Sequence, residues 1–489
     1  MMPIRSKLLL SGLVWVAAFI RFRGLFANRF HLDEALFSSW ARLIAVWQDP
    51  LLVTQTIDKP PLIMYLQAFF FPLVGPVEWA ARLPNFLASM LLVPLAALLA
   101  WRLYHEAGTA VLAALLIVLS PLSIQYSATA FTDPLLVALL VLALLLASGQ
   151  SRPALSGLFM GLAIATKFQA WLFVPLLVGL TWLQGWSWRQ WGRWLAGFFS
   201  ALFALSLWEV SRRGSPVLWS NQIVNFGGVR AAWSWEISPR LWGWARILHL
   251  SVGSQILVGL ALLAVIVLWI HANRRRDKSG SMDKMLILFV LAYLIIHWLL
   301  AVPIWDRYLL PLVPLFSIVL ARAVTVSCVW TSDRIGRYRK RQGQSKVQIG
   351  VVSMLVGIIL LSQSQNVIMA RNGQWPIGGQ PTADQGAWQV AQYLAKEPYG
   401  TVLYDHWYSW QWRYHLFDKG VYVSWFPHAK ALAEDISVFG DSGGDRYLVL
   451  PATATSRPVH RALAAAGYRL QPVLQTNYQP GMILYQIER

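Results

Sequence analysis

The chain has 489 residues, of which 57% are hydrophobic and only 13% are charged. This composition excludes an ordinary soluble enzyme and is typical of a polytopic membrane protein that carries some soluble mass. The formal net charge of +19 does not indicate nucleic-acid binding, because the basic residues lie mostly in short clusters between apolar runs. The single cysteine, Cys328, excludes a disulfide framework or a thiolate metal cluster within one chain.

The membrane spans begin close to the amino terminus. The first apolar run is followed by RFRG rather than by the small residues of a cleavage site, so it predicts a retained membrane helix. Apolar runs near the length that a bilayer requires predict about eleven spans. They lie at residues 8–20, 79–101, 109–125, 134–148, 154–167, 168–184, 194–210, 246–270, 285–301, 308–326 and 348–364.

Charge sets the predicted orientation of these spans. Lys and Arg are denser in the loops that fall inside when the amino terminus is cytoplasmic, most clearly in HANRRRDK and DRIGRYRKRQGQSK. Most acidic residues fall on the other side, so any chemistry is expected on the outer face. Short loops and one compact outer domain are typical of a bacterial protein, and the predicted location is the plasma (inner) membrane.

The first outer loop, residues 21–78, contains two charged motifs, HLDE and IDKPPL. Asp33 could serve as the N-cap of an amphipathic helix ALFSSWARLIAVW, and this role is compatible with a functional one. Asp58 and Lys59 precede a double proline that holds the preceding residues extended. The structural alternative for this pair is a turn with a lysine that snorkels to the interface.

Three further charged positions lie at the outer ends of spans. Asp133 precedes Pro134, as an N-cap precedes a proline at the first helical position. Lys167 lies inside an apolar run, where a charge is costly and usually functional, although snorkelling is the alternative. Arg307 ends a very short outer loop, where Asp306 could simply neutralise it.

After the last span the composition becomes that of a globular protein. Helical patterns such as GAWQVAQYLAK and PVHRALAAAGY alternate with the strand-like runs TVLY, RYLVLP and MILYQIE. The chain therefore divides into a membrane domain at residues 1–365 and a small α/β domain at residues 366–489, which is long enough to hold its own core and is expected outside the membrane.

Several motifs, taken in order, carry a family resemblance. They are DEALFSSWA, DKPPLIMYLQAFFFPLVG, EWAARLPNFLASMLLVPLAALL, SPLSIQYSATAFTDPLL, GLAIATKFQAWLFVP and DRYLLPLVPLF. Together they resemble the polyprenyl-phosphate-dependent glycosyltransferases of the GT-C type, especially the protein O-mannosyltransferase and aminoarabinose transferase branch. The resemblance covers most of residues 1–325, and it implies a helical GT-C membrane architecture with the α/β domain appended.

The resemblance implies that a sugar passes from a polyprenyl-phosphate carrier to an acceptor on the extracytoplasmic face. Asp33 would be the general base in a reaction that inverts the anomeric carbon, and Glu34 would support it or bind the acceptor. Lys59 and Arg307 would hold the carrier phosphate, which fits the negative charge that develops on a departing phosphate. The remaining predicted substrate-binding residues are Asp58, Arg82, Asp133, Lys167 and Tyr308.

Asp58 departs from the pattern of the aminoarabinose branch, which commonly has Glu at this position. The resemblance makes this acid a candidate ligand for a divalent metal cation, the one cofactor that we consider. The acceptor stays open between a lipid, a glycan and a protein, and the bilayer is the other expected partner. Two other functions stay open as well. One is a transporter or flippase of a lipid-linked sugar, which could use the same charges without catalysis. The other is a non-catalytic homologue whose outer domain binds glycans.

Overall fold

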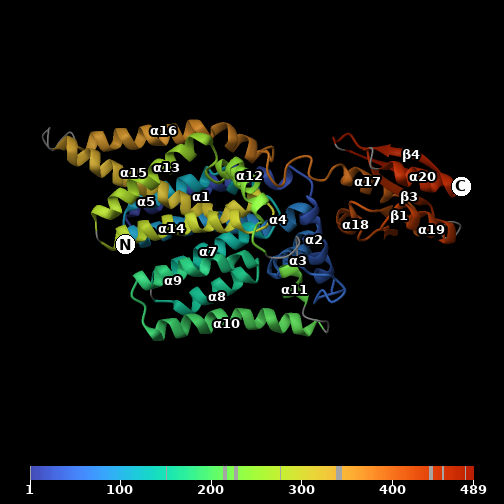
Figure 1. The fold of residues 1–489 in the computed structure, drawn as a ribbon, viewed down its shortest axis with the longest axis horizontal. Helices are drawn as coiled ribbons and strands as arrows, with labels where there is room; N and C mark the ends of the chain where they lie inside the picture. The colour runs from blue at the N-terminus through green and yellow to red at the C-terminus, as the bar shows by residue number, and fades with distance from the viewer. Residues whose placement is uncertain are drawn as a thin grey trace.

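The computed structural model describes residues 2–149, 151–212, 217–224, 230–275, 277–336, 344–439, 444–453, 456–479 and 481–489. Figure 1 shows a bundle of helices that contains the amino terminus, and a smaller unit with a sheet at the carboxyl end. Helices α2 and α3 lie at the end of the bundle nearest the sheet unit. Part of the basic run DRIGRYRKRQGQSK, residues 337–343, lies outside the described residues.

The long apolar helices form the membrane unit. Within the described residues, six segments are long and apolar enough to cross a bilayer. These are α1 with the 3₁₀ turn η1 (Ile4–Phe26), α4 (Glu78–Tyr104), α10 (Trp188–Ser211), α13 (Gln255–Arg274), α14 (Lys278–Leu299) and η4 with the start of α15 (Asp306–Trp330). A seventh is possible if α5 (Ala107–Val118) and α6 (Pro121–Ser127), which meet at 58°, form one broken span. The polytopic helical architecture is confirmed, but the count of eleven is not.

The predicted number of membrane spans differs from the structure mainly at the shorter helices. Shorter apolar helices occur at α3 (Leu62–Val74), α7 (Asp133–Ser148), α8 (Pro153–Ile164) and the η2–α9 segment (Phe168–Leu183). The predicted span at 246–270 is wrong, because this region is divided between α12 (Ser234–Val252) and α13. Gly253 makes the break: its φ of +95° is the left-handed conformation with which helices commonly end. The remaining helices here are α11 (Val217–Val224), η4 (Asp306–Leu312), α15 (Val313–Gly336) and α16 (Gln344–Arg371).

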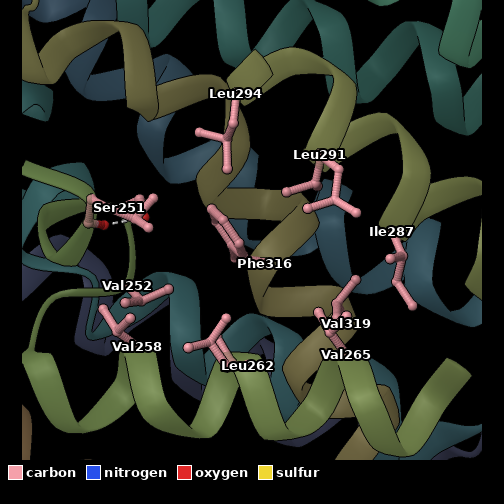
Figure 2. A pocket seen from close by; sticks show the side chains of 13 residues that line it. Ser251, Val252, Val258, Leu262, Val265, Ile287, Leu291, Leu294, Phe316 and Val319 are labelled. Carbon is pink, nitrogen blue, oxygen red and sulfur yellow. Dashed lines mark hydrogen bonds between the residues drawn. The ribbon is translucent and has the colours of Figure 1, made fainter. Parts of the chain in front are cut away.

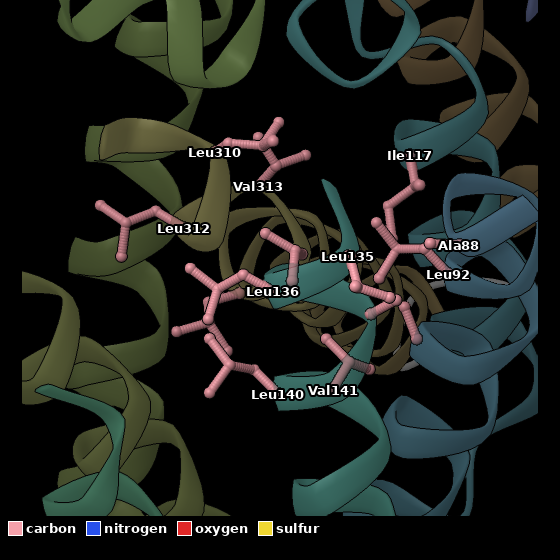
Figure 3. Packing of buried hydrophobic residues seen from close by; sticks show 14 of the residues in the cluster. Ala88, Leu92, Ile117, Leu135, Leu136, Leu140, Val141, Leu310, Leu312 and Val313 are labelled. Atoms are coloured by element: carbon pink, nitrogen blue, oxygen red, sulfur yellow. The ribbon is translucent and has the colours of Figure 1, made fainter. Parts of the chain in front are cut away.

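Helix packing inside the membrane unit depends on interdigitating aliphatic side chains and on small residues. Figure 3 shows side chains from α4, α5, α7, η4 and α15 packed together, among them Leu92, Ile117, Leu136 and Leu310. Helices α8 and α10 approach so closely that a Cβ atom added to Gly157 would lie 2.0 Å from the carbonyl oxygen of Trp194. Small residues at such contacts let helix backbones come together in a membrane.

The segment at residues 21–78, predicted to be the first outer loop, contains helices. The predicted helix is present as α2 (Leu32–Ala45), which begins before the predicted start. Its side chains Ala35, Phe37, Trp40 and Ala41 are buried, so this helix is packed against α3 and α18 (Ser409–His415) instead of lying on the bilayer surface. Helix α3 begins directly after Pro60 and Pro61, as the double proline predicts.

The carboxyl-terminal unit is a five-stranded mixed sheet with the order β2-β1-β3-β5-β4. β1 pairs in parallel with β2 and β3, whereas β5 is antiparallel to β3 and β4. Separate hydrophobic clusters cover its two faces, which confirms the small α/β domain. The strands are β1 (Thr401–Asp405), β2 (Val421–Trp425), β3 (Arg446–Pro451), β4 (Arg469–Gln475) and β5 (Met482–Glu488), and the other helices are α17 (Ala387–Leu394), α19 (Ala429–Phe439) and α20 (Arg457–Ala465).

Specific polar contacts join the two units. Arg42 of α2 donates to the carbonyl oxygen of Tyr414 at 2.7 Å and forms an ion pair with Asp418. The segment that follows α16 is fixed to α6, because the Gln125 amide donates to the Trp375 carbonyl at 2.9 Å and accepts from the Trp375 N–H at 3.0 Å. These contacts hold the sheet unit and its connection against the end of the bundle that contains α2.

Candidate functional site

A polar cavity of about 380 Å³ lies at this end of the bundle. Its lining comes from the start of α2, the IDKPPL motif, the α6–α7 region, the start of η4 and the segment after α16. It holds four predicted site residues of opposite charge, Asp33, Asp58, Lys59 and Arg307. Three distant parts of the membrane unit therefore bring charged groups to one cavity. We call it the charged cavity.

The first turn of α2 orients Asp33. His31, not Asp33, is the N-cap: its Nδ1 accepts from the backbone N–H of Asp33 at 3.1 Å, and the Glu34 carboxylate accepts from the backbone N–H of His31 at 2.9 Å. The prediction that Asp33 caps this helix is wrong, because the imidazole and Glu34 complete a capping box. The Asp33 carboxylate is thus left to face the charged cavity.

Asp33 meets Arg307 across the charged cavity. The Arg307 Nη1 lies 2.8 Å from the Asp33 Oδ2, and the Asp33 side chain is still 31% exposed. Burial alone would raise the pKa of Asp33, but the positive charges of Arg307, His31 and Lys59, with the hydrogen bond from Arg307, outweigh it and lower the pKa. Asp33 is therefore a carboxylate at neutral pH.

Arg307 is positioned by its neighbours in η4. The alternative that Asp306 neutralises the Arg307 guanidinium is not seen, because the Asp306 carboxylate accepts from the Tyr126 hydroxyl at 2.8 Å and from the backbone N–H groups of Arg307 and Gly378 at 2.7 and 3.2 Å. The guanidinium instead lies over the Trp305 ring, 4.1 Å from its centroid. Stacking and the Asp33 ion pair together aim Arg307 into the charged cavity.

Lys59 and Asp58 occupy another part of the cavity wall. The Lys59 Nζ lies 2.5 Å from the Asp58 Oδ2, and the two side chains are 16% and 33% exposed. Both residues line the charged cavity, and the charge of Lys59 acts on Asp33. Lys59 thus shares the charged cavity with Asp33 and Arg307.

Asp133 and Lys167 form a buried pair next to the charged cavity rather than in its wall. The Lys167 Nζ lies 2.6 Å from the Asp133 Oδ1, and 4.7 Å from the Tyr308 ring centroid. The predicted capping role of Asp133 is wrong: α7 begins at Asp133 itself, and no side chain caps it. Lys167 is paired in the protein interior, so the snorkelling alternative is not seen either. Asp133 also acts electrostatically on Arg307.

Glu34 and Arg82 are placed away from the charged cavity. Both are fully buried; the Arg82 Nε lies 3.2 Å from the Glu34 Oε1, which also accepts from the Ala130 N–H at 2.8 Å. Arg82 further donates to the carbonyl oxygens of Leu25 and Asn28. The predicted contacts of Glu34 with an acceptor and of Arg82 with a phosphate therefore have no support in this geometry. The pair joins α2 to α4.

The described residues do not fit a firmly held metal ion. No group of three or more His, Cys, Asp or Glu side chains among them is arranged to hold one. Asp58, the predicted ligand, faces the Lys59 ammonium, which competes with a cation for the same oxygen. Mg²⁺ and Ca²⁺ are usually held by several oxygen ligands. We therefore derive no chemistry through a metal at this position.

Sequence reasoning missed several residues that line the charged cavity. His31 and Phe131 lie in contact there, with ring centroids 5.4 Å apart, and Trp305 and Gly378 complete parts of the wall. A signal for His31 was present, since Glu34 three residues later is the spacing of a capping box. No signal in the sequence places Gly378 here, because it follows the last membrane helix.

A second kind of cavity, shown in Figure 2, is apolar. Its side chains come from α12, α13, α14 and α15, and it opens beside exposed leucines such as Leu262 and Leu291. Apart from the Ser251 hydroxyl, which donates to the Leu248 carbonyl, it contains no polar side chain. It offers no group for acid–base chemistry, so the charged cavity is the candidate site.

Comparison with known families finds a match in part of the membrane unit. Residues 58–208 match the family model described as dolichyl-phosphate-mannose-protein mannosyltransferase. The matched region contains Asp58, Lys59, Arg82, Asp133 and Lys167 but neither Asp33 nor Arg307. No curated protein sequence matches the chain.

Solved structures define the fold more closely. ArnT from Cupriavidus metallidurans in the apo state has 16% identity and a TM-score of 0.64, with 97% of each chain covered. The same protein bound to undecaprenyl phosphate gives 0.63, again at 16% identity and 97% coverage of each chain. The oligosaccharyltransferase of Archaeoglobus fulgidus, tethered with an acceptor peptide containing the NVT sequon, gives 0.55 at 11% identity over 98% of this chain and 74% of that one. The GT-C fold is confirmed.

Proposed function

We propose that the protein is a membrane glycosyltransferase that moves a sugar from a polyprenyl-phosphate carrier to an acceptor on the extracytoplasmic face. The observation that carries the proposal is the charged cavity, where Asp33 meets Arg307 from 274 positions away in the sequence and Lys59 lies in the same wall. The family model at residues 58–208 and the fold shared with ArnT support it.

The cations suit a phosphate leaving group. As the bond between the anomeric carbon and the phosphate oxygen breaks, negative charge gathers on the phosphate, and fixed cations stabilise that charge. The Arg307 guanidinium can bind two phosphate oxygens at once, whereas the Lys59 ammonium acts as a compact point charge. The charge of Asp133 acts on Arg307, and Asp133 is paired with Lys167, whose ammonium lies over the Tyr308 ring.

Asp33 suits the role of general base. Its carboxylate accepts the proton of the acceptor hydroxyl while the new bond between oxygen and the anomeric carbon forms, and the electrons of the broken bond leave with the phosphate. A carboxylate with a low pKa is a weak base for an alcohol, so it acts through proximity, by taking the proton as the bond forms. Attack from the side opposite the phosphate inverts the anomeric carbon.

The ion pairs suggest how the donor prepares this base. In the structure Arg307 is paired with Asp33, and Lys59 is paired with Asp58. A phosphate in the charged cavity competes for both cations, because charge-assisted bonds to phosphate are strong. Once Arg307 turns to the phosphate, the Asp33 carboxylate is released for the acceptor. Donor binding thereby exposes the base.

The proposed orientation follows from charge. Arg274 ends α13, Arg275 follows it and Lys278 begins α14, and the positive-inside rule assigns such basic helix ends to the cytoplasm. The charged cavity and the sheet unit then lie on the extracytoplasmic side of the plasma (inner) membrane, where a lipid-linked donor meets an acceptor.

The test compares two variants of the full chain reconstituted in vesicles with a polyprenyl-phosphate sugar. We expect Asp33→Asn to bind the donor while sugar transfer falls by about 10²- to 10⁴-fold, the usual contribution of a general base. Asp58→Asn, in the same cavity wall, is the matched control and should lose much less. Equal losses in the two variants would contradict the assignment of the base to Asp33.

The same vesicles distinguish the transporter alternative. A flippase would move the lipid-linked sugar across the bilayer without forming a glycosylated product, and Asp33→Asn would not abolish that movement selectively. Product that forms only with intact Asp33 supports transfer. Translocation without product would replace the proposal with the transporter.

A further inference from the structure

A larger cavity lies between the bundle and the sheet unit. Its volume is about 630 Å³, within the range of small-molecule sites. One wall comes from the segment before α2, including Asn28 and Arg29, and from the start of α4; the other comes from Trp388, Tyr414 and Tyr478 of the sheet unit. Both units are needed to form it. We call it the junction cavity.

The junction cavity shares two chain segments with the charged cavity. The segment before α2 lines the junction cavity at residues 27–29 and the charged cavity at His31 and Asp33. The segment after α16 lines the charged cavity at Gly378 and the junction cavity at Pro381. Four residues of extended chain span at most about 14 Å, so the Cα atoms of Arg29 and Asp33 are no farther apart than that.

The charges in the junction cavity are already balanced. The Arg29 Nη1 lies 3.0 Å from the Glu78 Oε2, and Arg42 is paired with Asp418. Burial, with smaller contributions from nearby arginines, lowers the pKa of His415 to about 4, so its imidazole is neutral at pH 7. Its buried Nε2 has no hydrogen-bond partner within the described chain. A neutral ligand with hydroxyl groups fits this lining better than an ionic one.

Aromatic rings make up much of the remaining lining. Trp79, Trp388, Tyr414 and Tyr478 all line the junction cavity, and the Arg29 guanidinium already covers one face of the Trp388 ring, 4.1 Å from its centroid. Aromatic faces pack against the C–H faces of sugar rings, while neighbouring guanidinium, carboxylate and amide groups bind the hydroxyls. This combination of rings and planar polar groups is suited to carbohydrate.

A polypeptide ligand fits less well. Extended peptides commonly bind by adding a strand to an exposed sheet edge. The edges of this sheet are β2 and β4, and neither strand lines the junction cavity. The lining from the sheet unit comes instead from the segment before α17, α17 itself, the end of α18 and the turn after β4.

We propose that the junction cavity binds the carbohydrate part of the acceptor, a neutral oligosaccharide, and presents its terminal hydroxyl toward Asp33. This inference rests on the proposed function for the acceptor role, but the binding of carbohydrate can be measured without any transfer reaction.

The experiment uses the full chain in lipid nanodiscs and three neutral trisaccharides as probes: chitotriose, mannotriose and maltotriose. Ligand-observed NMR gives the Kd of each. We expect at least one probe to bind with a Kd of about 10 mM or lower. Trp388→Ala should weaken that binding by about tenfold, the order of one aromatic contact. Trp425→Ala, which removes a 58% exposed tryptophan from β2, should leave it unchanged.

The outcomes separate this inference from the proposed function. Absence of binding for all three probes, equal weakening by the two tryptophan variants, or tighter binding of an unstructured peptide rich in Ser and Thr would overturn the inference. Asp33→Asn should leave probe binding intact. Probe binding that depends on Trp388, in a protein that never transfers sugar, would support the cavity assignment while removing the proposed glycosyltransferase activity.

Discussion

Two ion pairs stand on opposite sides of the first turn of α2. On one side, Asp33 and Arg307 meet at the charged cavity, where the Asp33 side chain is 31% exposed. On the other side, Glu34 and Arg82 are fully buried between α2 and α4. The two carboxylates are neighbours in the sequence, yet a helix turns by about 100° per residue, so adjacent side chains leave it in different directions.

The difference in exposure indicates which of the two ion pairs can take part in chemistry. The Asp33 pair is reached by solvent, and a ligand can take its cation. The Glu34 carboxylate accepts from Arg82, from the Ala130 N–H and from the His31 N–H, so its oxygens are already committed. The buried pair holds the turn in place, and the exposed pair is available to a substrate.

The largest expected effect on stability is at the buried pair. Glu34→Gln leaves the Arg82 guanidinium buried without its counter-ion, and breaking such a pair costs about 3–5 kcal/mol. Asp33→Asn should cost less, because the Asp33 side chain is 31% exposed and the Arg307 guanidinium keeps its contact with the Trp305 ring. Thermal unfolding of both variants in the same detergent measures the contrast. Equal destabilisation would show that the two pairs do not differ as the geometry indicates.

A smaller effect is expected on donor binding. Lys59→Ala removes one of the two cations that face the donor phosphate, and we expect the KM for donor to rise by about tenfold or more while the KM for acceptor changes little. Lys419→Ala, in the sheet unit and absent from the lining of the charged cavity, is the control. A similar rise for donor and acceptor would contradict the assignment of Lys59 to the phosphate.

The pH dependence of sugar transfer should report the ionisation of Asp33. Because the pKa of Asp33 is lowered, the base stays ionised as the pH falls to the ordinary range of an aspartate, and activity declines only below it. Arg307→Met removes the largest charge effect that lowers this pKa, so the acid limb of kcat/KM for donor should move to higher pH. An unmoved limb would mean that another group controls it.

The smallest expected effect is that of metal removal. Since the described residues do not fit a firmly held metal ion, we expect transfer by the purified protein to be the same with and without EDTA. Added Mg²⁺ after EDTA treatment is the control. A loss of transfer with EDTA that Mg²⁺ restores would support Asp58 as a metal ligand. It would also mean that Asp58 is not paired with Lys59 in the active protein.

Sequence reasoning identified charged residues of the cavity better than it placed the boundaries of the helices. The apolar runs and the ordered motifs indicated the helical GT-C fold, and they singled out Asp33, Lys59 and Arg307 from loops far apart. The error at residues 246–270 came from Gly253, because mean hydropathy over a window does not reveal a left-handed residue that ends a helix. Burial of Glu34 could not be predicted either, since hydropathy treats adjacent acids alike.

What the sequence by itself determined is the class of environment: apolar runs require a bilayer, and charges at the ends of these runs require partners. Tertiary structure alone decided which residue forms an ion pair with which. Helical rotation sent Asp33 toward Arg307 and Glu34 toward Arg82, and packing brought the segment after α16 against the site. The physical reason is that a charge near a membrane must be compensated, but its counter-ion is chosen by distance in space, which the order of residues does not record.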